Sequence, residues 1–278
     1  MIIDCHVHLN NYTEEPTTLE QRFQRMQAQL DKYGIDHAFV ITSYAAHDKR
    51  PSVDEVIKVC RQDPRLHVVE GVSLYGKAPF SLQAIEERLR RRDIIALKLY
   101  PGYEYYYPTD KICRPIYELA IEYDVPVMVH TGDCYNPKAK VKYAHPLHLD
   151  EVAVDYPELR IVMAHLGNPW FRDTAEVIYK NSNVYADISG LVLGDIAENF
   201  EAWLKQQVRE IIQFAGEPDK LLYGTDWPIV NMGPYLKLMD SLDLDPEARE
   251  KLLWKNTVRV FKHPNIEVAS PTRREVNA

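Results

Sequence analysis

The first residues whose types could support catalysis or metal binding are two histidines close to the N-terminus. A short apolar run opens the chain and ends in His6-Val7-His8. Residues two apart in a β-strand point to the same face, so both imidazoles should project together from the end of a strand. Neutral imidazole is the commonest metal-binding side chain in proteins. The pair therefore predicts half of a metal site, with two histidines in a surface loop as the alternative.

Four more polar residues end otherwise apolar runs: Lys98, His130, His165 and Asp226. Each has an ordinary structural explanation when taken alone. A histidine in such a place is often a hydrogen-bonded core residue, the aspartate could cap a turn, and the lysine could pair with a carboxylate. Polar residues with unrelated roles would not all fall at the same end of the strands by chance. Their shared position therefore predicts one site at which they meet.

Short apolar runs alternate with amphipathic segments along the chain. The expected strands are residues 1–7, 37–42, 66–73, 94–100, 125–130, 160–165, 183–189 and 220–223. The expected helices lie near 18–33, 52–62, 81–92, 110–123, 148–156, 173–181, 195–215, 233–241 and 246–262. Eight strand–helix repeats predict an α/β fold, a (β/α)8 TIM barrel in a single domain over residues 1–262, followed by a polar C-terminal tail at 263–278.

The alternative fold is an open, doubly wound sheet. That fold would usually show a glycine-rich turn after the first strand, and His8-Leu-Asn-Asn is not such a turn. In a barrel, catalytic groups sit at the carboxyl ends of the strands. Strand alternation puts His165 on the face of Met163 and Ile161, which predicts that this face points into the barrel.

Several short motifs around these residues resemble one enzyme superfamily. They are Asp4-Cys-His6-Val-His8, Lys98-Leu-Tyr-Pro, Val129-His130-Thr-Gly, Ala164-His165-Leu-Gly-Asn, Tyr223-Gly-Thr-Asp226-Trp-Pro and the terminal segment 255–261. With these pieces in this order, the chain resembles the amidohydrolase superfamily. It looks closest to the amidohydrolase-related branch that includes aminocarboxymuconate-semialdehyde decarboxylase and dicarboxylate lactonases. The similarity spans about residues 1–262 and says little about the substrate.

The resemblance implies a metal site. His6, His8, His130 and Asp226 match a mononuclear site, and His165 matches the group that polarises the substrate or orients the metal-bound water. In binuclear members, a lysine at the position of Lys98 is carbamylated and bridges two metals, and the residues matching His130 and His165 bind the second. Metal-free lactonases also exist in the branch, so one metal, two metals and none remain open.

The chemistry that such a site supports can be stated from the residue types. Zn²⁺ suits imidazole and carboxylate ligands, although Mn²⁺ or Fe²⁺ would also fit. A bound metal lowers the pKa of water from 15.7 towards roughly 7. Asp226 could accept the proton and deliver it to the leaving group, while His165 could donate to the developing oxyanion. The expected reaction is hydrolysis of an amide, lactam, lactone or related acyl bond of a small molecule, with decarboxylation of a small carboxylated substrate as the alternative.

Substrate-binding residues are sought in the loops that follow the strands. The candidates are Tyr103, Tyr105, Asn168, Trp170 and Trp227. Aromatic rings there could form an apolar pocket with hydroxyl handles, but they could equally pack loops or a subunit interface. No arginine stands at a strand end, which weakens the case for a dicarboxylate substrate.

Composition narrows the functional class further. The 278 residues have a net charge of −8 and a pI of about 5.7, a poor match to nucleic acid or an anionic membrane surface. No run of residues is apolar enough for a membrane span, and no secretory signal is visible. The four cysteines are widely spaced, and this spacing indicates reduced thiols rather than disulfides. We therefore expect a cytoplasmic enzyme with a small-molecule substrate, and homo-oligomerisation is the default expectation.

Overall fold

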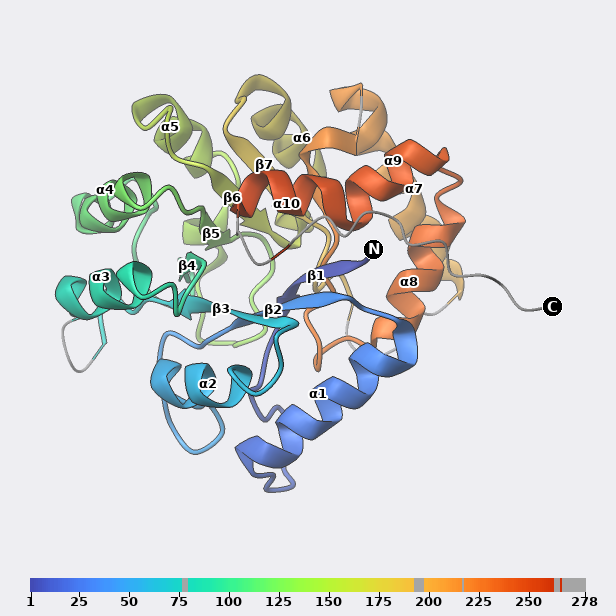
Figure 1. The fold of residues 1–278 in the computed structure, drawn as a ribbon. Helices are drawn as coiled ribbons and strands as arrows, with labels where there is room; N and C mark the ends of the chain where they lie inside the picture. The colour runs from blue at the N-terminus through green and yellow to red at the C-terminus, as the bar shows by residue number, and fades with distance from the viewer. Residues whose placement is uncertain (77–79, 193–197, 217, 263–265, 267–278) are drawn as a thin grey trace.

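The computed structural model is an eight-stranded parallel barrel, as the repeat pattern predicts (Figure 1). It describes residues 1–76, 80–192, 198–216, 218–262 and 266. The strands are β1 (Ile3–Val7), β2 (His37–Ile41), β3 (Leu66–Gly71), β4 (Ala96–Leu99), β5 (Val127–His130), β6 (Ile161–Ala164), β7 (Val184–Asp187) and β8 (Leu221–Leu222). Each strand pairs in parallel with the next one along the chain.

Backbone hydrogen bonds between the first and last strands close the barrel. The Cys5 N–H donates to the Tyr223 carbonyl at 3.0 Å, and the Asp226 N–H donates to the His6 carbonyl at 2.7 Å. The His8 N–H reaches the Trp227 carbonyl, also at 2.7 Å. These bonds continue past the short β8 into its loop, so the end of β1 and the segment after β8 are held as one unit.

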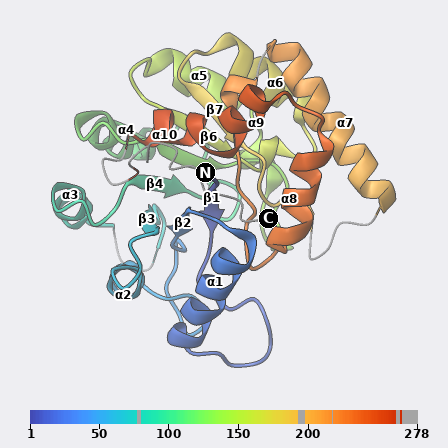
Figure 2. The same ribbon diagram turned by 45° about the vertical axis from the view of Figure 1, so that its right-hand side comes forward.

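Helices surround the strands, as two views show (Figures 1 and 2). They are α1 (Leu19–Tyr33), α2 (Val53–Cys60), α3 (Leu82–Arg90), α4 (Arg114–Glu122), α5 (His148–Asp155), α6 (Phe171–Lys180), α7 (Glu198–Ala215), α8 (Met232–Ser241), α9 (Pro246–Glu250) and α10 (Asn256–Phe261). Reciprocal side-chain and backbone hydrogen bonds cap the first two, at Thr18 with Gln21 and at Ser52 with Glu55.

Two of the expected helices are divided in the structure. The helix expected over 110–123 begins as a 3₁₀ turn at Lys111–Cys113 and continues as α4. The single helix expected over 246–262 is divided into α9, a π-helical turn at Lys251–Lys255 and α10. The first three residues of the helix expected at 195–215 lie outside the described residues, as does the tail except for Ile266. Within the described residues, no helix is both long enough and apolar enough to span a membrane.

Two apolar clusters make up the core, one inside the barrel and one between the strands and the helices. Met128 and Val162 belong to the inner cluster, whereas Met163 and Ile161 belong to the outer one. The prediction that Met163 and Ile161 share an inward face with His165 is therefore wrong. β6 ends at Ala164, and His165 follows in a left-handed turn with φ of 65°, which breaks the strand alternation.

Candidate active site

The two β1 histidines are held by their Nδ1 atoms. His6 Nδ1 lies 2.9 Å from Asp187 Oδ2, and His8 Nδ1 lies 2.7 Å from the carbonyl oxygen of Ile41. Both partners are acceptors, so each Nδ1 bears the proton and each Nε2 keeps a lone pair. A histidine fixed in this way by a carboxylate or carbonyl presents Nε2 as a metal ligand.

Asp226, in the segment after β8, lies close to the Nε2 atoms of both histidines. Its Oδ1 lies 3.0 Å from His8 Nε2 and 3.6 Å from His6 Nε2. The residue has a φ of 70°, and it follows Thr225, whose N–H and hydroxyl both donate to the buried carboxylate of Asp4. The Asp4 of the first motif therefore positions the segment that holds Asp226.

Burial and charge set the protonation of this cluster. Burial lowers the pKa of His6 to about 3, which keeps the imidazole neutral at pH 7. Burial alone would raise the pKa of Asp226, but the contact with His8 and the neighbouring imidazoles lower it to about 2. The site therefore combines a neutral His6 imidazole with an ionised Asp226 carboxylate.

This donor set fits a divalent metal ion. Ligand atoms of His6, His8 and Asp226 all lie within 4.8 Å of one another and are buried. Among the described residues, none gives Asp226 Oδ1 a hydrogen bond of good geometry, although His8 Nε2 is close to it. Two imidazoles and a carboxylate with one unsatisfied oxygen are suitable ligands for Zn²⁺ or Mn²⁺.

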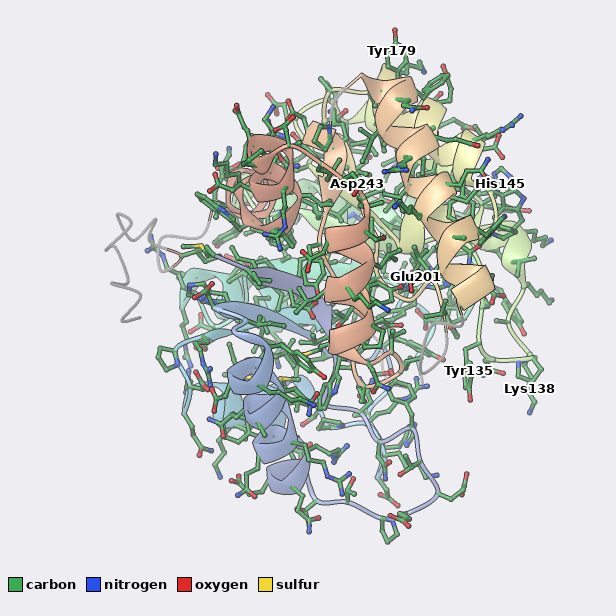
Figure 3. All side chains as sticks on the ribbon, turned by 90° about the vertical axis from the view of Figure 1, so that its right-hand side faces the viewer. Tyr135, Lys138, His145, Tyr179, Glu201 and Asp243 are labelled. Carbon is green, nitrogen blue, oxygen red and sulfur yellow. The ribbon has the colours of Figure 1, made fainter. Side chains whose placement is uncertain are left out.

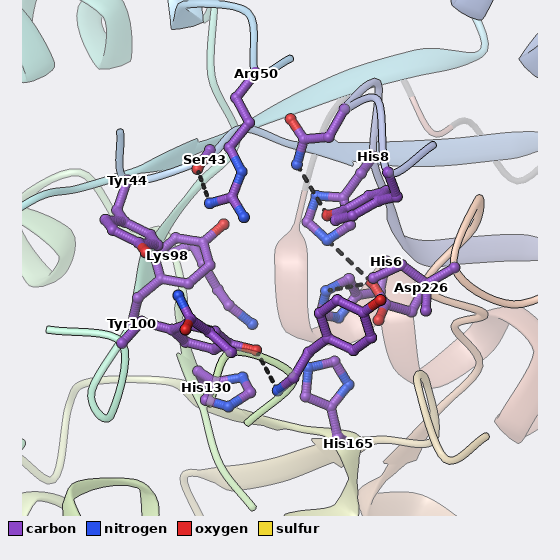
Figure 4. Close-up of a pocket in the computed structure, with 16 residues that line it drawn as sticks. His6, His8, Ser43, Tyr44, Arg50, Lys98, Tyr100, His130, His165 and Asp226 are labelled. Carbon is purple, nitrogen blue, oxygen red and sulfur yellow. Dashed lines mark hydrogen bonds and ion pairs between the residues drawn. The ribbon is translucent and has the colours of Figure 1, made fainter. Parts of the chain in front are cut away.

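His130, Lys98 and His165 complete the predicted set on the pocket wall (Figure 4). The structure brings all six strand-end residues to one pocket, as the sequence predicts, but His130 is not part of the His6–His8–Asp226 cluster. The rings of His130 and His165 lie 5.1 Å apart, and His130 Nε2 is 3.6 Å from the sulfur of Cys134.

Lys98 is the most unusual of these residues. Its side chain is buried, and its Nζ has no hydrogen-bond partner among the described residues. Burial lowers the pKa of the Lys98 ammonium to about 8, so a fraction of the amine is neutral near physiological pH. The neutral amine is the form that carbamylation requires, and whether this lysine is carbamylated stays a prediction.

The pocket also contains residues that the sequence analysis missed. The inner pocket has about 80 Å³ of enclosed free volume, or about 570 Å³ when the open space at its mouth is included. Arg50 enters from the loop after β2. Tyrosine rings form much of the wall, and those that the sequence analysis did not single out are Tyr12, Tyr44, Tyr100 and Tyr135. Loop positions have no periodic signal, so only residue type could have pointed to them.

Arg50 brings to the pocket the arginine that the strand ends lack. No arginine ends a strand, yet Arg50 reaches the pocket from nine residues beyond β2. Its guanidinium donates to Ser43 Oγ at 3.0 Å, and no carboxylate pairs with it in the part of the chain that the structure describes. The backbones of Arg50 and His47 exchange two hydrogen bonds, so a tight turn holds the arginine in place. A cation is therefore available to a substrate carboxylate.

Only some of the five predicted substrate-binding residues line a pocket. Tyr103 lines the inner pocket and an adjoining outer one, and Asn168 lines the outer one. Tyr105, Trp170 and Trp227 line neither. Tyr105 is exposed and donates its hydroxyl proton to the carbonyl of Lys138. Lys138 lies on the loop after β5 (Figure 3). Trp170 packs on His145, and Trp227 is buried beside β1.

The chain belongs to the amidohydrolase family, whose model matches residues 3–262. This match confirms the resemblance seen in the strand-end motifs. One curated relative is the 2-keto-4-carboxy-3-hexenedioate hydratase of Sphingobium sp., 27% identical over 186 residues, which are 55% of this chain and 51% of that protein. Another is the gamma-resorcylate decarboxylase of Polaromonas sp., 25% identical over 187 residues, which are 53% of this chain and 54% of that protein.

The aligned region thus spans about half the length of each curated relative. Among solved structures, a dihydroxybenzoic acid decarboxylase from Polaromonas sp. has the same fold, with a TM-score of 0.65 and 15% identity over 95% of this chain and 98% of that one. That structure contains bound manganese and the inhibitor 2-nitroresorcinol. At this identity the likeness shows the fold alone.

Proposed function

We propose that this protein is a metal-dependent carbon–carbon lyase that decarboxylates a small, carboxylated aromatic or conjugated substrate. The observation that supports it best is the Arg50 guanidinium, which pairs with no carboxylate among the described residues and lies in the same tyrosine-walled pocket as the His6–His8–Asp226 cluster. The hydrolysis that the sequence favoured has support only at the level of the family, whereas the decarboxylase alternative has a curated relative.

The pocket suits a flat, anionic substrate. Arg50 can hold a carboxylate through a two-pronged hydrogen-bonded pair. Rings of Tyr44, Tyr100 and Tyr103 lie with centroids 5.1 to 6.4 Å apart, which makes an aromatic wall against which a conjugated ring can stack. Both curated relatives are named for small unsaturated carboxylates, which supports the same substrate class.

Decarboxylation requires a proton at the carbon that loses CO₂. The bond from that carbon to the carboxylate carbon breaks, its electron pair stays on the substrate carbon, and a proton replaces CO₂. Asp226 and His165 line the pocket and are the groups that we expect to take up and deliver this proton. Tyr100 is buried and Tyr44 and Tyr103 are half-buried, so these rings would limit the access of bulk water to the reacting carbon.

We propose one divalent ion at His6, His8 and Asp226, because their ligand atoms lie within 4.8 Å of one another and all three residues line the pocket. The other such group among the described residues, His6 with His165 and Asp187, includes a carboxylate that does not line the pocket. When bound, such an ion supplies Lewis-acid polarisation of substrate oxygens. Zn²⁺ and Mn²⁺ both accept these ligands, and the manganese of the dihydroxybenzoic acid decarboxylase supports Mn²⁺ as the first ion to test.

Product analysis tests this proposal. Protein supplied with Mn²⁺ or Zn²⁺ is incubated with gamma-resorcylate and a panel of hydroxybenzoates in ¹⁸O-labelled water, and in D₂O. We expect CO₂ release, one deuterium in the organic product and no ¹⁸O in it, with Asp226→Asn as the inactive control. Incorporation of ¹⁸O without CO₂ would instead identify a hydrolase or, if a double bond is lost, a hydratase.

A further inference from the structure

The segment after β7 contacts both a proposed metal ligand and the proposed proton-transfer residue. Ser189 Oγ lies 3.0 Å from Nδ1 of His6 and 3.0 Å from Nδ1 of His165. Its third neighbour is Asp187 Oδ1, at 2.5 Å. Ser189 is fully buried, so these contacts are made without competition from solvent.

The proton of the Ser189 hydroxyl can be assigned. Asp187 acts as an acceptor at both oxygens, because Oδ1 accepts two backbone N–H groups and Oδ2 lies 2.9 Å from Nδ1 of His6. An ionised carboxylate only accepts hydrogen bonds, so Ser189 donates to Asp187 and keeps its lone pairs for the two imidazoles. The same Asp187 oxygen accepts the backbone N–H groups of His165 and Ser189, which ties the segments after β6 and β7 together.

The protonated nitrogen of His165 follows from its two neighbours. His165 Nδ1 faces Ser189 Oγ and, at 3.1 Å, the Ser189 carbonyl oxygen. A carbonyl oxygen can only accept, so a proton must lie on Nδ1. With the proton on Nε2 instead, the Nδ1 lone pair would face the carbonyl oxygen with nothing between them.

We propose that Ser189 is a positioning residue that, with Asp187, holds His6 and His165 as Nδ1–H tautomers and directs the Nε2 lone pairs of both into the pocket. The inference rests on the proposed function only for the role of His165. It revises the expectation that His165 donates to an oxyanion. Neutral His165 offers a lone pair at Nε2, so it accepts a proton before it can deliver one.

The tautomer is measured directly by ¹⁵N NMR of the histidine rings in the Zn²⁺-loaded protein, with His165→Asn to assign the resonances. We expect the wild-type His165 ring to show a protonated Nδ1. A proton on Nε2 together with a bare Nδ1 overturns the proposal. This readout needs no substrate, so it remains decisive if decarboxylation is not found.

Kinetics test the positioning role, once turnover of any substrate has been detected. Removal of a group that orients a metal ligand commonly costs about 10- to 100-fold in activity. We expect Ser189→Ala to lower kcat by about that factor with little change in KM, and Ser189→Thr, which keeps the hydroxyl, to restore most of it. The matched control is Ser241→Ala, whose hydroxyl only bonds a carbonyl within α8. An unchanged kcat in Ser189→Ala, or equal losses in the Ala and Thr variants, would overturn the role.

Discussion

At the scale of single residues, the site depends on charges that are buried or held in place. Oδ1 of Asp226 lies close to the Nε2 atoms of both β1 imidazoles, and Arg50 pairs with no carboxylate in the described part of the chain. The two face the same pocket. A substrate that bridges them would place one carboxylate at the arginine and its reacting end at the metal ligands.

Replacement of Arg50 tests that arrangement. A hydrogen bond to a charged group contributes about 1.5–3 kcal/mol. We therefore expect Arg50→Gln to raise KM for the active carboxylate by about 10- to 100-fold, with a smaller change in kcat, in steady-state assays. Lys49→Gln is the matched control, because its ammonium lies outside the pocket and bonds Thr13 and Glu14. Equal effects of the two substitutions would show that only general electrostatics is involved.

At the scale of elements, the loops that follow the strands set the geometry of the site. His165 and Asp226 both lie at positive φ, and each follows the end of its strand. Gly190 fits closely between them, with a φ of 63°. A Cβ added at Gly190 would lie 2.5 Å from His165 Nδ1 and 3.0 Å from Asp226 Oδ2.

Gly190→Ala should therefore displace both side chains. A side chain at positive φ costs about 1–2 kcal/mol on its own. Displacement of catalytic groups by about 1 Å can cost about 100-fold in rate, so we expect kcat to fall by at least that factor. Gly34→Ala is a close control, since Gly34 has the same φ of 63° and nothing within 4 Å of an added Cβ.

Thermal unfolding and activity assays distinguish the two glycine variants. Both should lose about 1–2 kcal/mol of stability from a side chain in the left-handed region, and Gly190→Ala should lose more, because its Cβ also displaces His165. Only Gly190→Ala should lose activity. If Gly34→Ala were equally inactive, global destabilisation rather than the crowding of His165 would explain the result.

At the scale of the whole molecule, the metal cluster joins the two ends of the barrel. His6 and His8 come from β1, and Asp226 follows β8, where backbone hydrogen bonds already close the sheet. A bound ion would therefore stabilise the closure between the first and last strands. The subunit arrangement remains a prediction from the sequence.

Metal binding should raise the melting temperature. A ligand at about 100 times its Kd stabilises the folded state by about 2.7 kcal/mol. For a chain of this size, we expect a rise in Tm of about 5 °C with Mn²⁺ or Zn²⁺, reversed by a chelator. Calorimetry on His6→Ala should show no rise, whereas His148→Ala, on α5, should respond like the wild type. No shift in the wild-type protein would contradict the metal site.

The sequence by itself determined the barrel and the residues at its strand ends. Apolar runs of strand length alternate with amphipathic helices, and parallel strands necessarily bring their carboxyl ends to one face. His6, His8, Lys98, His130, His165 and Asp226 therefore meet in one pocket, as predicted. The positions of these residues at strand ends can be predicted from the local hydrophobic periodicity, which a single sequence contains.

Only the tertiary structure decided how those residues are oriented and what surrounds them. The Arg50 turn, the left-handed turn at His165 and the buried Ser189 lie beyond strand ends, where no periodic pattern exists. The contacts that matter also join distant positions, such as Ser189 with His6, 183 residues apart. Hydrogen-bond geometry across such separations arises from packing of the closed barrel, so composition and spacing cannot specify it.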